Sequence, residues 1–249
     1  MSWDGSFSAD SPDQIVLGGQ ETHLWLAELV CQQDRFDQLR SFLCPEERQR
    51  ASRFRFEEHR RSWVASRGIL RELLGSYLGL APDQVRFAYN EFGKPRLHER
   101  QGALHFNLAH SHHRALYGFS DGRELGVDIE QVQSRRVSEG IPERFFAAAE
   151  VQYLRSLPEA EQVEAFFNIW TRKEAFVKGV GRGLSLGLDR FEVAVDVPGT
   201  PTPVVVLDAD VSCELWVTVQ LSPGPGYAAA VALKGDPGLI RGWRVQAGS

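Results

Sequence analysis

The sequence has few cysteines and no long apolar run. Its 249 residues include three cysteines, Cys31, Cys44 and Cys213, and this odd, widely spaced set excludes a disulfide framework and a cysteine-rich zinc site. The small number of cysteines favours a protein of a reducing compartment. No apolar stretch approaches the about 18 residues of a membrane span, and the polar, acidic start lacks the pattern of a signal peptide. These absences predict a cytoplasmic protein that has no membrane partner.

Positive charge is concentrated in one segment of the chain. The formal net charge is −5, which argues against a nucleic-acid partner. Residues 46–71 nevertheless hold eight arginines against four glutamates, so a basic patch lies on an acidic protein. Such a patch suits a single anionic ligand or partner surface. A solvated helix face with Arg–Glu pairs would have the same composition, and the sequence leaves both interpretations open.

Lysine is rarer than arginine throughout the chain. Only four of the 28 basic residues are lysines, and three of them, Lys94, Lys173 and Lys178, lie in two short segments next to glycine. The lysine ammonium is a compact charge that suits phosphate, whereas the arginine guanidinium is a planar fork. The clustering therefore indicates two candidate phosphate-binding segments.

The apolar pattern predicts an α+β fold with a core, because 43% of the residues are hydrophobic. Runs with alternating or helical spacing predict strand, helices and strands in that order, twice along the chain. The first set comprises a strand at 23–30, helices at 34–43, from Pro45 and at 57–79, and strands at 85–89 and 114–119. The second comprises a strand at 125–131, helices at 142–157 and 159–178, and strands at 191–195, 203–207, 214–221 and 227–233.

This repeated order divides the chain into two similar halves. We expect an N-terminal half over 1–121, which begins with a loose Gly/Ser/Asp-rich arm at 1–22, and a C-terminal half over 122–249. Short connections between neighbouring strands favour antiparallel pairing over a doubly wound parallel sheet.

The segment Gly126-Val127-Asp128-Ile129-Glu130 places two carboxylates on a predicted strand. Residues two apart on a strand face the same side, so Asp128 and Glu130 project together while Val127 and Ile129 turn to the core. Adjacent carboxylates repel each other unless a cation lies between them, and oxygen-only ligation suits Mg²⁺. A solvent-facing strand with two charged residues would show the same pattern.

The predicted helix over 159–178 carries Trp170, Glu174 and Lys178 at intervals of four residues. That spacing places the three side chains on one stripe of the helix. Glu174 and Lys178 alone would be typical of a surface ion pair, but Trp170 sets the pair at the edge of the apolar face. A carboxylate and an ammonium group there could serve a metal ion and a phosphate.

Two further segments carry polar residues that suit binding. The first, F-N-L-A-H-S over 106–111, is followed by His112 and His113. No cysteine and no H-x-x-x-H spacing accompany these histidines, so we do not expect a zinc site. We expect one phosphate-binding histidine and place His112 and His113 at the surface. The second, N-E-F-G-K-P over 90–95, is a turn that presents a lysine.

In their order, these motifs resemble those of the Sfp-type 4′-phosphopantetheinyl transferases. The resemblance also includes R-F-F over 144–146 with Glu150, and G-R-G-L-S over 181–185, and it covers roughly 45–195. Members of the family transfer the 4′-phosphopantetheine arm of coenzyme A to a serine of an apo acyl or peptidyl carrier protein and release adenosine 3′,5′-bisphosphate. The family fold implies two α+β halves related by a pseudo-twofold axis, with the active site between them, in a monomer.

The resemblance implies roles for individual residues. Asp128, Glu130 and Glu174 look like Mg²⁺ ligands, and Glu174 also looks like the base for the attacking serine. Lys178 would stabilise the leaving group, so Glu174, Lys178 and Asp128 form the catalytic set. The residues that resemble coenzyme A contacts are Arg50, Asn90, Glu91, Phe92, Gly93, Lys94, Asn107, Leu108, Ala109, His110 and Lys178.

Three positions depart from this pattern or leave it open. The family often has serine where this chain has Ala109, and the lost hydroxyl would weaken coenzyme A binding. Arg67 is a further candidate contact in the basic segment. Glu150 matches a family acid to which we assign no role.

Two other functions are compatible with parts of the sequence. A Mg²⁺-dependent nuclease would also use a D-x-E pair with a further acid and a lysine, but in the order E-x-K and in a basic groove. This chain has Lys173 before Glu174 and is acidic. A binding module for coenzyme A or a carrier protein would be favoured if a metal ligand were missing, but all three carboxylates are present. The motifs therefore favour the transferase.

Overall fold

The computed structural model describes residues 5–10, 12, 15–102, 104–134, 137, 140–181, 186–194, 199–207 and 215–245. Its first elements are strand β1 (Glu21–Glu28), helices α1 (Gln33–Ser41), α2 (Pro45–Ala51) and α3 (Glu57–Leu78), and strands β2 (Phe87–Tyr89), β3 (Pro95–Leu97), β4 (Leu104–Ser111) and β5 (Arg114–Asp121). Then come strand β6 (Leu125–Gln131), helices α5 (Ile141–Phe145), α6 (Ala148–Ser156) and α7 (Glu159–Val180), and strands β7 (Phe191–Val193), β8 (Thr202–Val206), β9 (Trp216–Leu221), β10 (Tyr227–Lys234) and β11 (Leu239–Arg244).

The helix ends follow the local chemistry of the sequence. Helix α2 begins at Pro45, as predicted, and the Glu47 carboxylate accepts the backbone N–H of Cys44 at 3.1 Å. Helix α3 ends at Gly79 with φ 64°, and α7 ends at Gly181 with φ 74°. Glycine adopts this left-handed conformation without strain, so it stops both helices cleanly.

The strands form two sheets and a hairpin. One sheet has the order β11-β1-β5-β4, the other has the order β6-β10-β9-β8-β7, and β2 pairs with β3. All neighbours are antiparallel except β1 and β11, which run parallel. The predicted α+β class and the preference for antiparallel pairing are confirmed.

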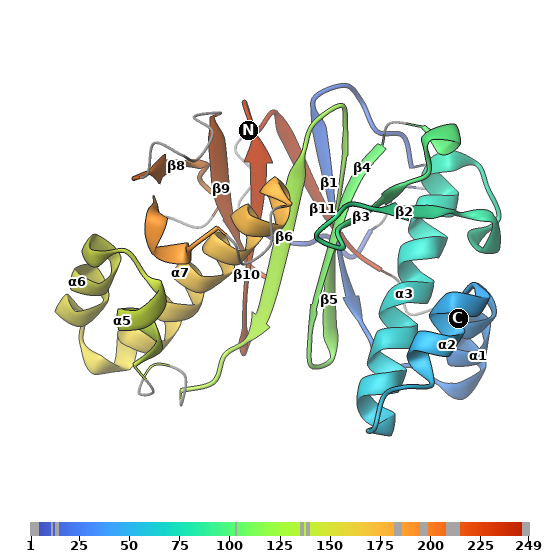
Figure 1. The fold of residues 1–249 in the computed structure, drawn as a ribbon, viewed down its shortest axis with the longest axis horizontal. Coiled ribbons are helices and arrows are strands. Elements are labelled where there is room, and N and C mark those ends of the chain that lie inside the picture. Colours follow the sequence, from blue (N-terminus) through green and yellow to red (C-terminus); the bar gives the residue numbers. More distant parts are fainter. Residues whose placement is uncertain are drawn as a thin grey trace.

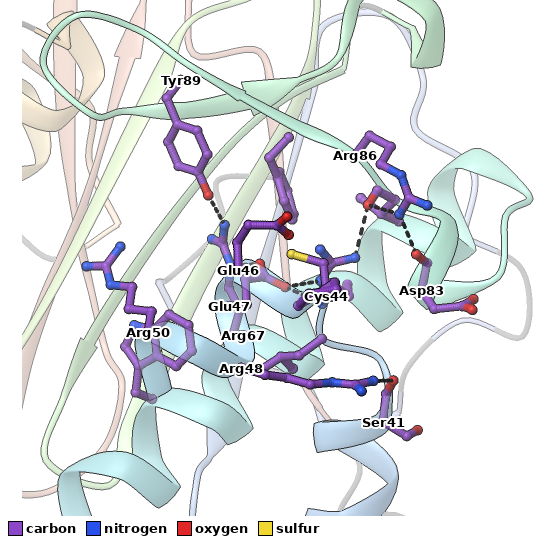
Figure 2. A pocket seen from close by; sticks show the side chains of 16 residues that line it. Ser41, Cys44, Glu46, Glu47, Arg48, Arg50, Arg67, Asp83, Arg86 and Tyr89 are labelled. Atoms are coloured by element: carbon purple, nitrogen blue, oxygen red, sulfur yellow. Dashed lines mark hydrogen bonds and ion pairs between the residues drawn. The ribbon is translucent and has the colours of Figure 1, made fainter. Parts of the chain in front are cut away.

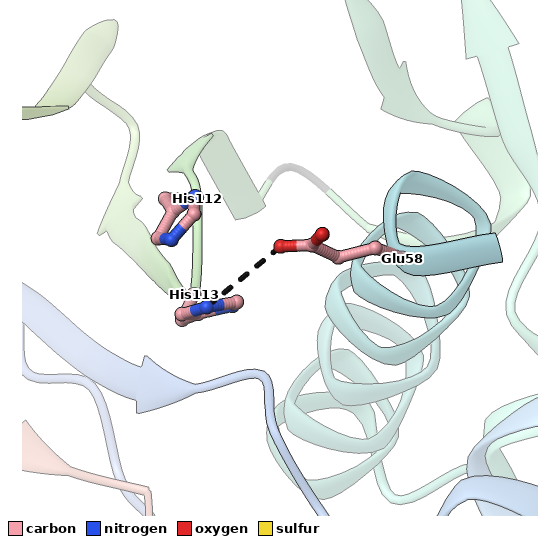
Figure 3. A group of neighbouring side chains, drawn as sticks. All are labelled: Glu58, His112 and His113. Atoms are coloured by element: carbon pink, nitrogen blue, oxygen red, sulfur yellow. Dashed lines mark ion pairs between the residues drawn. The ribbon is translucent and has the colours of Figure 1, made fainter. Parts of the chain in front are cut away.

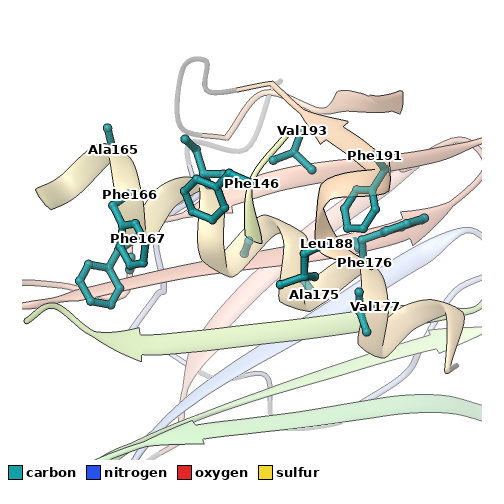
Figure 4. Packing of buried hydrophobic residues seen from close by; sticks show 14 of the residues in the cluster. Phe146, Ala165, Phe166, Phe167, Ala175, Phe176, Val177, Leu188, Phe191 and Val193 are labelled. Carbon is teal, nitrogen blue, oxygen red and sulfur yellow. The ribbon is translucent and has the colours of Figure 1, made fainter. Parts of the chain in front are cut away.

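The two sheets stand at the centre of the molecule, with helices α1–α3 outside one of them and α5–α7 outside the other (Figure 1). A core between the sheets contains Leu24 and Leu116 from the first sheet and Val127, Val219 and Val231 from the second. A second core lies between α3 and the first sheet. The third lies under α7, where rings such as Phe146, Phe166, Phe176 and Phe191 interlock (Figure 4).

The predicted helix over 142–157 is wrong as a single element. The chain is extended at Phe146 and Ala147, which separates α5 from α6. The break lets the Phe146 ring stack on Phe166 at 5.2 Å between centroids. The Glu150 carboxylate accepts the N–H of Ala147 at 2.9 Å and so caps α6. Side-chain packing and this cap outweigh the helical spacing of the segment.

Strand β11 was not predicted, and it joins the sheet of the other half. It pairs in parallel with β1, from Glu21 opposite Leu239 to Leu26 opposite Arg244. Residues of the expected loose arm also attach there, because Ser8 exchanges backbone hydrogen bonds with Gly242 and Arg244 and Phe7 is buried. The two ends of the chain therefore complete one sheet.

Some predictions lie outside the described residues, among them those at Cys213 and 182–185. The halves 1–121 and 122–249 and the pseudo-twofold axis remain predictions. Among the helices in the described part of the chain, none combines the length and the apolar character that a membrane crossing requires.

Candidate functional site

Strand β6 presents two carboxylates toward helix α7. Val127 and Ile129 point into the core between the sheets, as predicted, so Asp128 and Glu130 face the other way. Their pairing partners on β10 are Ala230 and Ala228, whose small side chains lie under α7. Asp128 is 3% exposed and Glu130 is half-buried.

Two glycines bring α7 close to this strand. A Cβ atom added to Gly126 would lie 2.1 Å from the carbonyl oxygen of Ala175 and 2.2 Å from the backbone nitrogen of Gly179. A Cβ added to Gly179 would meet the Trp216 ring at 2.6 Å. Only glycine permits this approach of helix to strand, and the approach places Glu174 and Lys178 over Asp128. The glycine spacing in the sequence gave no indication of this role.

The closest charge contact in the site joins Lys178 to Asp128. The Lys178 ammonium nitrogen lies 2.6 Å from the Oδ1 atom of Asp128. Burial lowers the pKa of Lys178, but the negative charge of Asp128, with smaller effects from Glu174 and Glu130, raises it above the ordinary value overall. The ammonium is therefore held in its charged form. Its nearest partner is Asp128, not the Glu174 of a helical ion pair.

Glu174 completes the group of carboxylates from the helix side. Burial raises the pKa of Glu174, and the negative charges of Asp128 and Glu130 raise it further against the opposing effect of Lys178. The three acids are therefore close enough to repel one another. A cation would relieve that repulsion, and an oxygen-only donor set suits Mg²⁺.

The three carboxylates do not form a compact ligand cluster in this structure. Among the described residues, the ligand atoms of Asp128, Glu130 and Glu174 do not all come within 4.8 Å of one another. The donor chemistry and the mutual repulsion fit a magnesium site, and the Lys178 ammonium beside Asp128 supplies positive charge at the same place.

Strand β4 holds β6 in position through two side chains. Asn107 is buried, and its Oδ1 atom accepts the backbone N–H of Val127 at 2.9 Å. Ser111 donates its hydroxyl to Glu130 at 2.9 Å and accepts the N–H of Gln131 at 3.1 Å. The sequence analysis assigned no secondary structure to this segment, and the structure shows a strand whose polar side chains link the two sheets.

The other predicted contacts on β4 differ in their accessibility. Leu108 packs in the core under α3, and Ala109 lies in the core between the sheets, so both side chains are committed to packing. His110 is open to solvent. The protein around its ring lowers the pKa of His110, and the Lys178 ammonium lowers it further. The imidazole is thus close to the charged group and accessible to a ligand.

The turn over 90–94 contacts the end of α7. The Lys94 ammonium donates to the carbonyl oxygen of Gly179 at 2.7 Å, and the Asn90 side chain donates to that of Gly181 at 3.0 Å. The Asn90 Oδ1 atom also accepts the N–H groups of Phe92 and Lys94 and so shapes the turn. Glu91, Phe92 and Gly93 at its tip are exposed. The ammonium predicted for phosphate thus caps a helix here, since last-turn carbonyls attract a cation.

Replacing Lys94 with methionine should change how stability depends on pH. Burial lowers the pKa of Lys94 from 10.5 to about 8. Between pH 8 and 10.5 the unfolded chain therefore holds a proton that the folded chain has released, so the free energy of unfolding rises with pH because of this group. Unfolding by urea at several pH values would measure this effect. Between pH 8 and 10.5, the free energy of unfolding of the parent chain should increase by about 1–3 kcal/mol relative to that of Lys94→Met. A constant difference would show that Lys94 keeps its ordinary pKa.

A cavity of about 730 Å³ lies between α2, α3 and the segment 83–89 (Figure 2). At its base the buried Glu47 carboxylate accepts from Arg67 at 2.5 Å and from Arg71 at 2.7 Å. Burial raises the pKa of Glu47, but the two guanidinium groups outweigh it and lower the pKa overall. One carboxylate thus faces two buried cations. The polar and aromatic residues of the lining include Arg48, Arg50, Arg67, Arg71, Arg86, Trp63, Phe87 and Tyr89.

Four of the eight arginines of the basic segment line this cavity, whereas Arg60 forms an exposed pair with Glu57, so both interpretations of the segment hold in part. Arg67, a candidate contact, also donates to the Tyr89 hydroxyl at 2.9 Å. The Arg50 guanidinium lies over the Trp63 ring, 5.5 Å from its centroid. Among the described residues, no carboxylate lies within ion-pair distance of Arg50. Positive charge beside aromatic rings suits a nucleotide with phosphate groups.

Replacing Arg50 with alanine should weaken binding of coenzyme A about tenfold or more, because a charged hydrogen bond contributes on the order of 1.5–3 kcal/mol. Arg48→Ala is the matched control, since its guanidinium in the same cavity is already engaged with the Ser41 carbonyl at 2.9 Å. Calorimetric titration of both variants would check this, and equal losses would remove the special role of Arg50.

Lys173 is buried in the core, so of the two lysines in its segment only Lys178 remains a candidate for phosphate. The Lys173 side chain is 0% exposed and its ammonium lies 2.7 Å from the Glu150 carboxylate. It also donates to the carbonyl oxygens of Leu188 and Phe191. Glu150, to which the sequence assigned no role, therefore belongs to the structural core of this half.

Comparisons with known proteins find the same family in the N-terminal and C-terminal parts of the sequence. Residues 124–232 match the family model described as 4′-phosphopantetheinyl transferase superfamily, and residues 30–118 match the one described as 4′-phosphopantetheinyl transferase, N-terminal. The 4′-phosphopantetheinyl transferase HetI of Nostoc sp. is 38% identical over 226 residues, which are 90% of this chain and 92% of the relative. The transferases ffp and Sfp of Bacillus subtilis are 33% and 30% identical, each over 207 residues, 80% of this chain and 85% of the relative.

Proposed function

Because the chain belongs to the 4′-phosphopantetheinyl transferase superfamily, we propose that the face between β6 and α7 carries out its reaction. The enzyme transfers the 4′-phosphopantetheine arm of coenzyme A to a carrier protein, an activity in keeping with the relatives, which are named 4′-phosphopantetheinyl transferases. The acceptor is a serine of an apo acyl or peptidyl carrier protein, and the other product is adenosine 3′,5′-bisphosphate.

The observation that carries this proposal is the meeting of four charged groups from distant parts of the chain. Asp128 and Glu130 come from β6, and Glu174 and Lys178 come from α7, with the Lys178–Asp128 contact at 2.6 Å. Burial raises the pKa of Glu174, and the negative charges of Asp128 and Glu130 raise it further. A diphosphate ester with its counter-cation would match this combination of acids and ammonium.

The reaction is a displacement at phosphorus. The serine oxygen forms a bond to the phosphorus that carries the pantetheine arm, and the bond from that phosphorus to the oxygen of adenosine 3′,5′-bisphosphate breaks. The serine proton passes to the carboxylate of Glu174, directly or through a water molecule. Lys178, held in its charged form, stabilises the negative charge that builds up on the leaving oxygen.

Asp128, Glu130 and Glu174 would hold Mg²⁺. When bound, the ion would neutralise the diphosphate and align it for attack. The chain's own groups recognise the rest of coenzyme A. The cavity beside Arg50 takes the adenosine phosphate end. His110, which is near Lys178, and the turn over 90–94, which contacts the end of α7, bind the part of coenzyme A next to the diphosphate. We further propose that the enzyme acts as a monomer in the cytoplasm.

Intact-mass spectrometry of an apo carrier protein tests this function. After incubation with the chain, coenzyme A and Mg²⁺, the carrier should gain the mass of one phosphopantetheine group, and EDTA should prevent the gain. An acyl and a peptidyl carrier protein are both offered as acceptors. No mass gain on either, together with tight binding of coenzyme A in a titration, would instead indicate a binding module.

A further inference from the structure

Glu58, His112 and His113 form a cluster outside the proposed transfer site. Glu58 lies in the first turn of α3, and the two histidines form the turn between β4 and β5 (Figure 3). One ligand atom of each side chain lies within 4.8 Å of the other two. In the part of the chain that the structure describes, no other set of three histidine, cysteine or acidic side chains comes so close.

The backbone of the turn directs both imidazoles to the same side. His112 has φ 54°, a left-handed conformation that is uncommon for residues other than glycine. The ring centroids of His112 and His113 are 3.8 Å apart. The carbonyl oxygen of His113 accepts the N–H of Leu29 at 2.7 Å, which fixes the turn against the end of β1. The two rings are therefore paired before any ligand arrives.

Among the described residues, neither ring nitrogen of His113 has a hydrogen-bond partner in this cluster. The Nε2 atom of His113 lies 3.8 Å from the Glu58 carboxylate, beyond hydrogen-bond distance. The Nδ1 atom of His113 is shielded from solvent and has no hydrogen-bond partner there. Buried ring nitrogens usually have a partner. The described residues therefore leave the Nδ1 atom of His113 without a hydrogen-bond partner.

We propose that Glu58, His112 and His113 bind a divalent transition-metal ion of the zinc type. Two imidazoles and one carboxylate form a donor set that zinc accepts, with a further position open to water. Magnesium prefers oxygen ligands and would not select this cluster. Zinc ligands about 2.0–2.2 Å from the ion stand roughly 3–3.5 Å from one another. Glu58 and His112 are exposed and free to close the remaining distance.

The ion would tie two elements of the N-terminal half together. It would join the first turn of α3 to the β4–β5 turn, next to Ser111, which donates its hydroxyl to Glu130. The ion would use none of the three carboxylates proposed for magnesium. This site therefore goes beyond the transfer reaction and does not depend on it.

Calorimetric titration with Zn²⁺, in a buffer that contains excess Mg²⁺, tests the proposal without coenzyme A or a carrier protein. The chain should bind one zinc equivalent. His112→Asn and Glu58→Gln should each weaken that binding at least tenfold, because even the loss of an outer-shell partner weakens metal binding about 10–100-fold. His59→Asn and Glu57→Gln are the matched controls, as exposed neighbours of Glu58, and should leave zinc affinity unchanged.

Cobalt provides a second readout of the ligands themselves. Co²⁺ bound by the parent chain should give visible absorption bands, and both ligand variants should lose them while their circular dichroism shows an intact fold. Zinc binding of equal affinity in the parent chain and both ligand variants would overturn the proposal. So would the absence of zinc binding by the parent chain. Neither result would change the mass that the carrier protein gains in the transfer experiment. The zinc site and the transfer reaction can therefore be disproved independently of each other.

Discussion

Replacing Asp128 with asparagine should reduce transfer by about a hundredfold to a thousandfold or more, the cost of removing one preorganised charge contact from an active site. Asparagine keeps the size of the side chain but removes the charge that binds the Lys178 ammonium at 2.6 Å. It also removes one of the three carboxylates that fit Mg²⁺. The rate of mass gain by the carrier protein, at saturating coenzyme A, measures the effect.

Glu124→Gln is the matched control for this experiment. Glu124 directly precedes β6, and its carboxylate pairs with Lys234 at 3.1 Å in a contact that is partly open to solvent. Such pairs contribute about 0–1 kcal/mol to stability, and Glu124 has no place in the proposed reaction. Its transfer rate should stay within about twofold of the parent. If Asp128→Asn also kept the parent rate while folded, the charged face between β6 and α7 would not be the active site.

The strand that carries these carboxylates could be predicted because its periodicity is local. Alternation over 125–131 places Val127 and Ile129 inside and Asp128 outward, and the structure confirms both. Segment 104–111 also forms a strand, but its polar Asn107 lies in the core because it bonds to Val127 on another strand. That bond joins residues 20 apart, and no local pattern reports it.

Contacts between segments that are distant in the sequence could not be predicted from local patterns. Strand β11 was missed because its partner β1 lies at the other end of the chain. Glu58 was not connected with His112 and His113 because more than fifty residues separate them. In contrast, the charges of Glu174 and Lys178 were found from their spacing, and the sequence offered them either as an ion pair with each other or as groups for a metal ion and a phosphate. The structure pairs Lys178 with Asp128, because the glycines at 126 and 179 let the helix approach the strand.

Removing one partner of the buried pair of Lys173 and Glu150 should strongly destabilise the protein. The ammonium is fully buried and donates to the carbonyl oxygens of Leu188 and Phe191 at 2.7 and 2.6 Å. The carboxylate accepts the N–H groups of Ala147 and Val193 at 2.9 and 2.8 Å. One ion pair thus connects α6, α7 and the start of β7. Burial lowers the pKa of Lys173 and raises that of Glu150, so each charge depends on its partner.

Replacing Lys173 with methionine should lower the free energy of unfolding by about 3–5 kcal/mol, because it leaves a buried carboxylate without its cation. Two buried carbonyl groups would lose their donor as well. Unfolding by urea, followed by circular dichroism, would measure the loss. Lys234→Met, which breaks a partly exposed pair, should cost no more than about 1 kcal/mol.

The double variant Lys173→Met/Glu150→Gln separates the effect of charge from that of packing. Glutamine carries no charge and keeps one acceptor oxygen, so it retains the contact with only one of the two N–H groups, those of Ala147 and Val193. If the isolated charge causes the loss, the double variant should be more stable than Lys173→Met alone, since a buried pair is often replaced as a whole at little cost. If the double variant is less stable than the single one, the carboxylate contributes through its backbone contacts instead, and the buried charge is not what Lys173 is needed to neutralise.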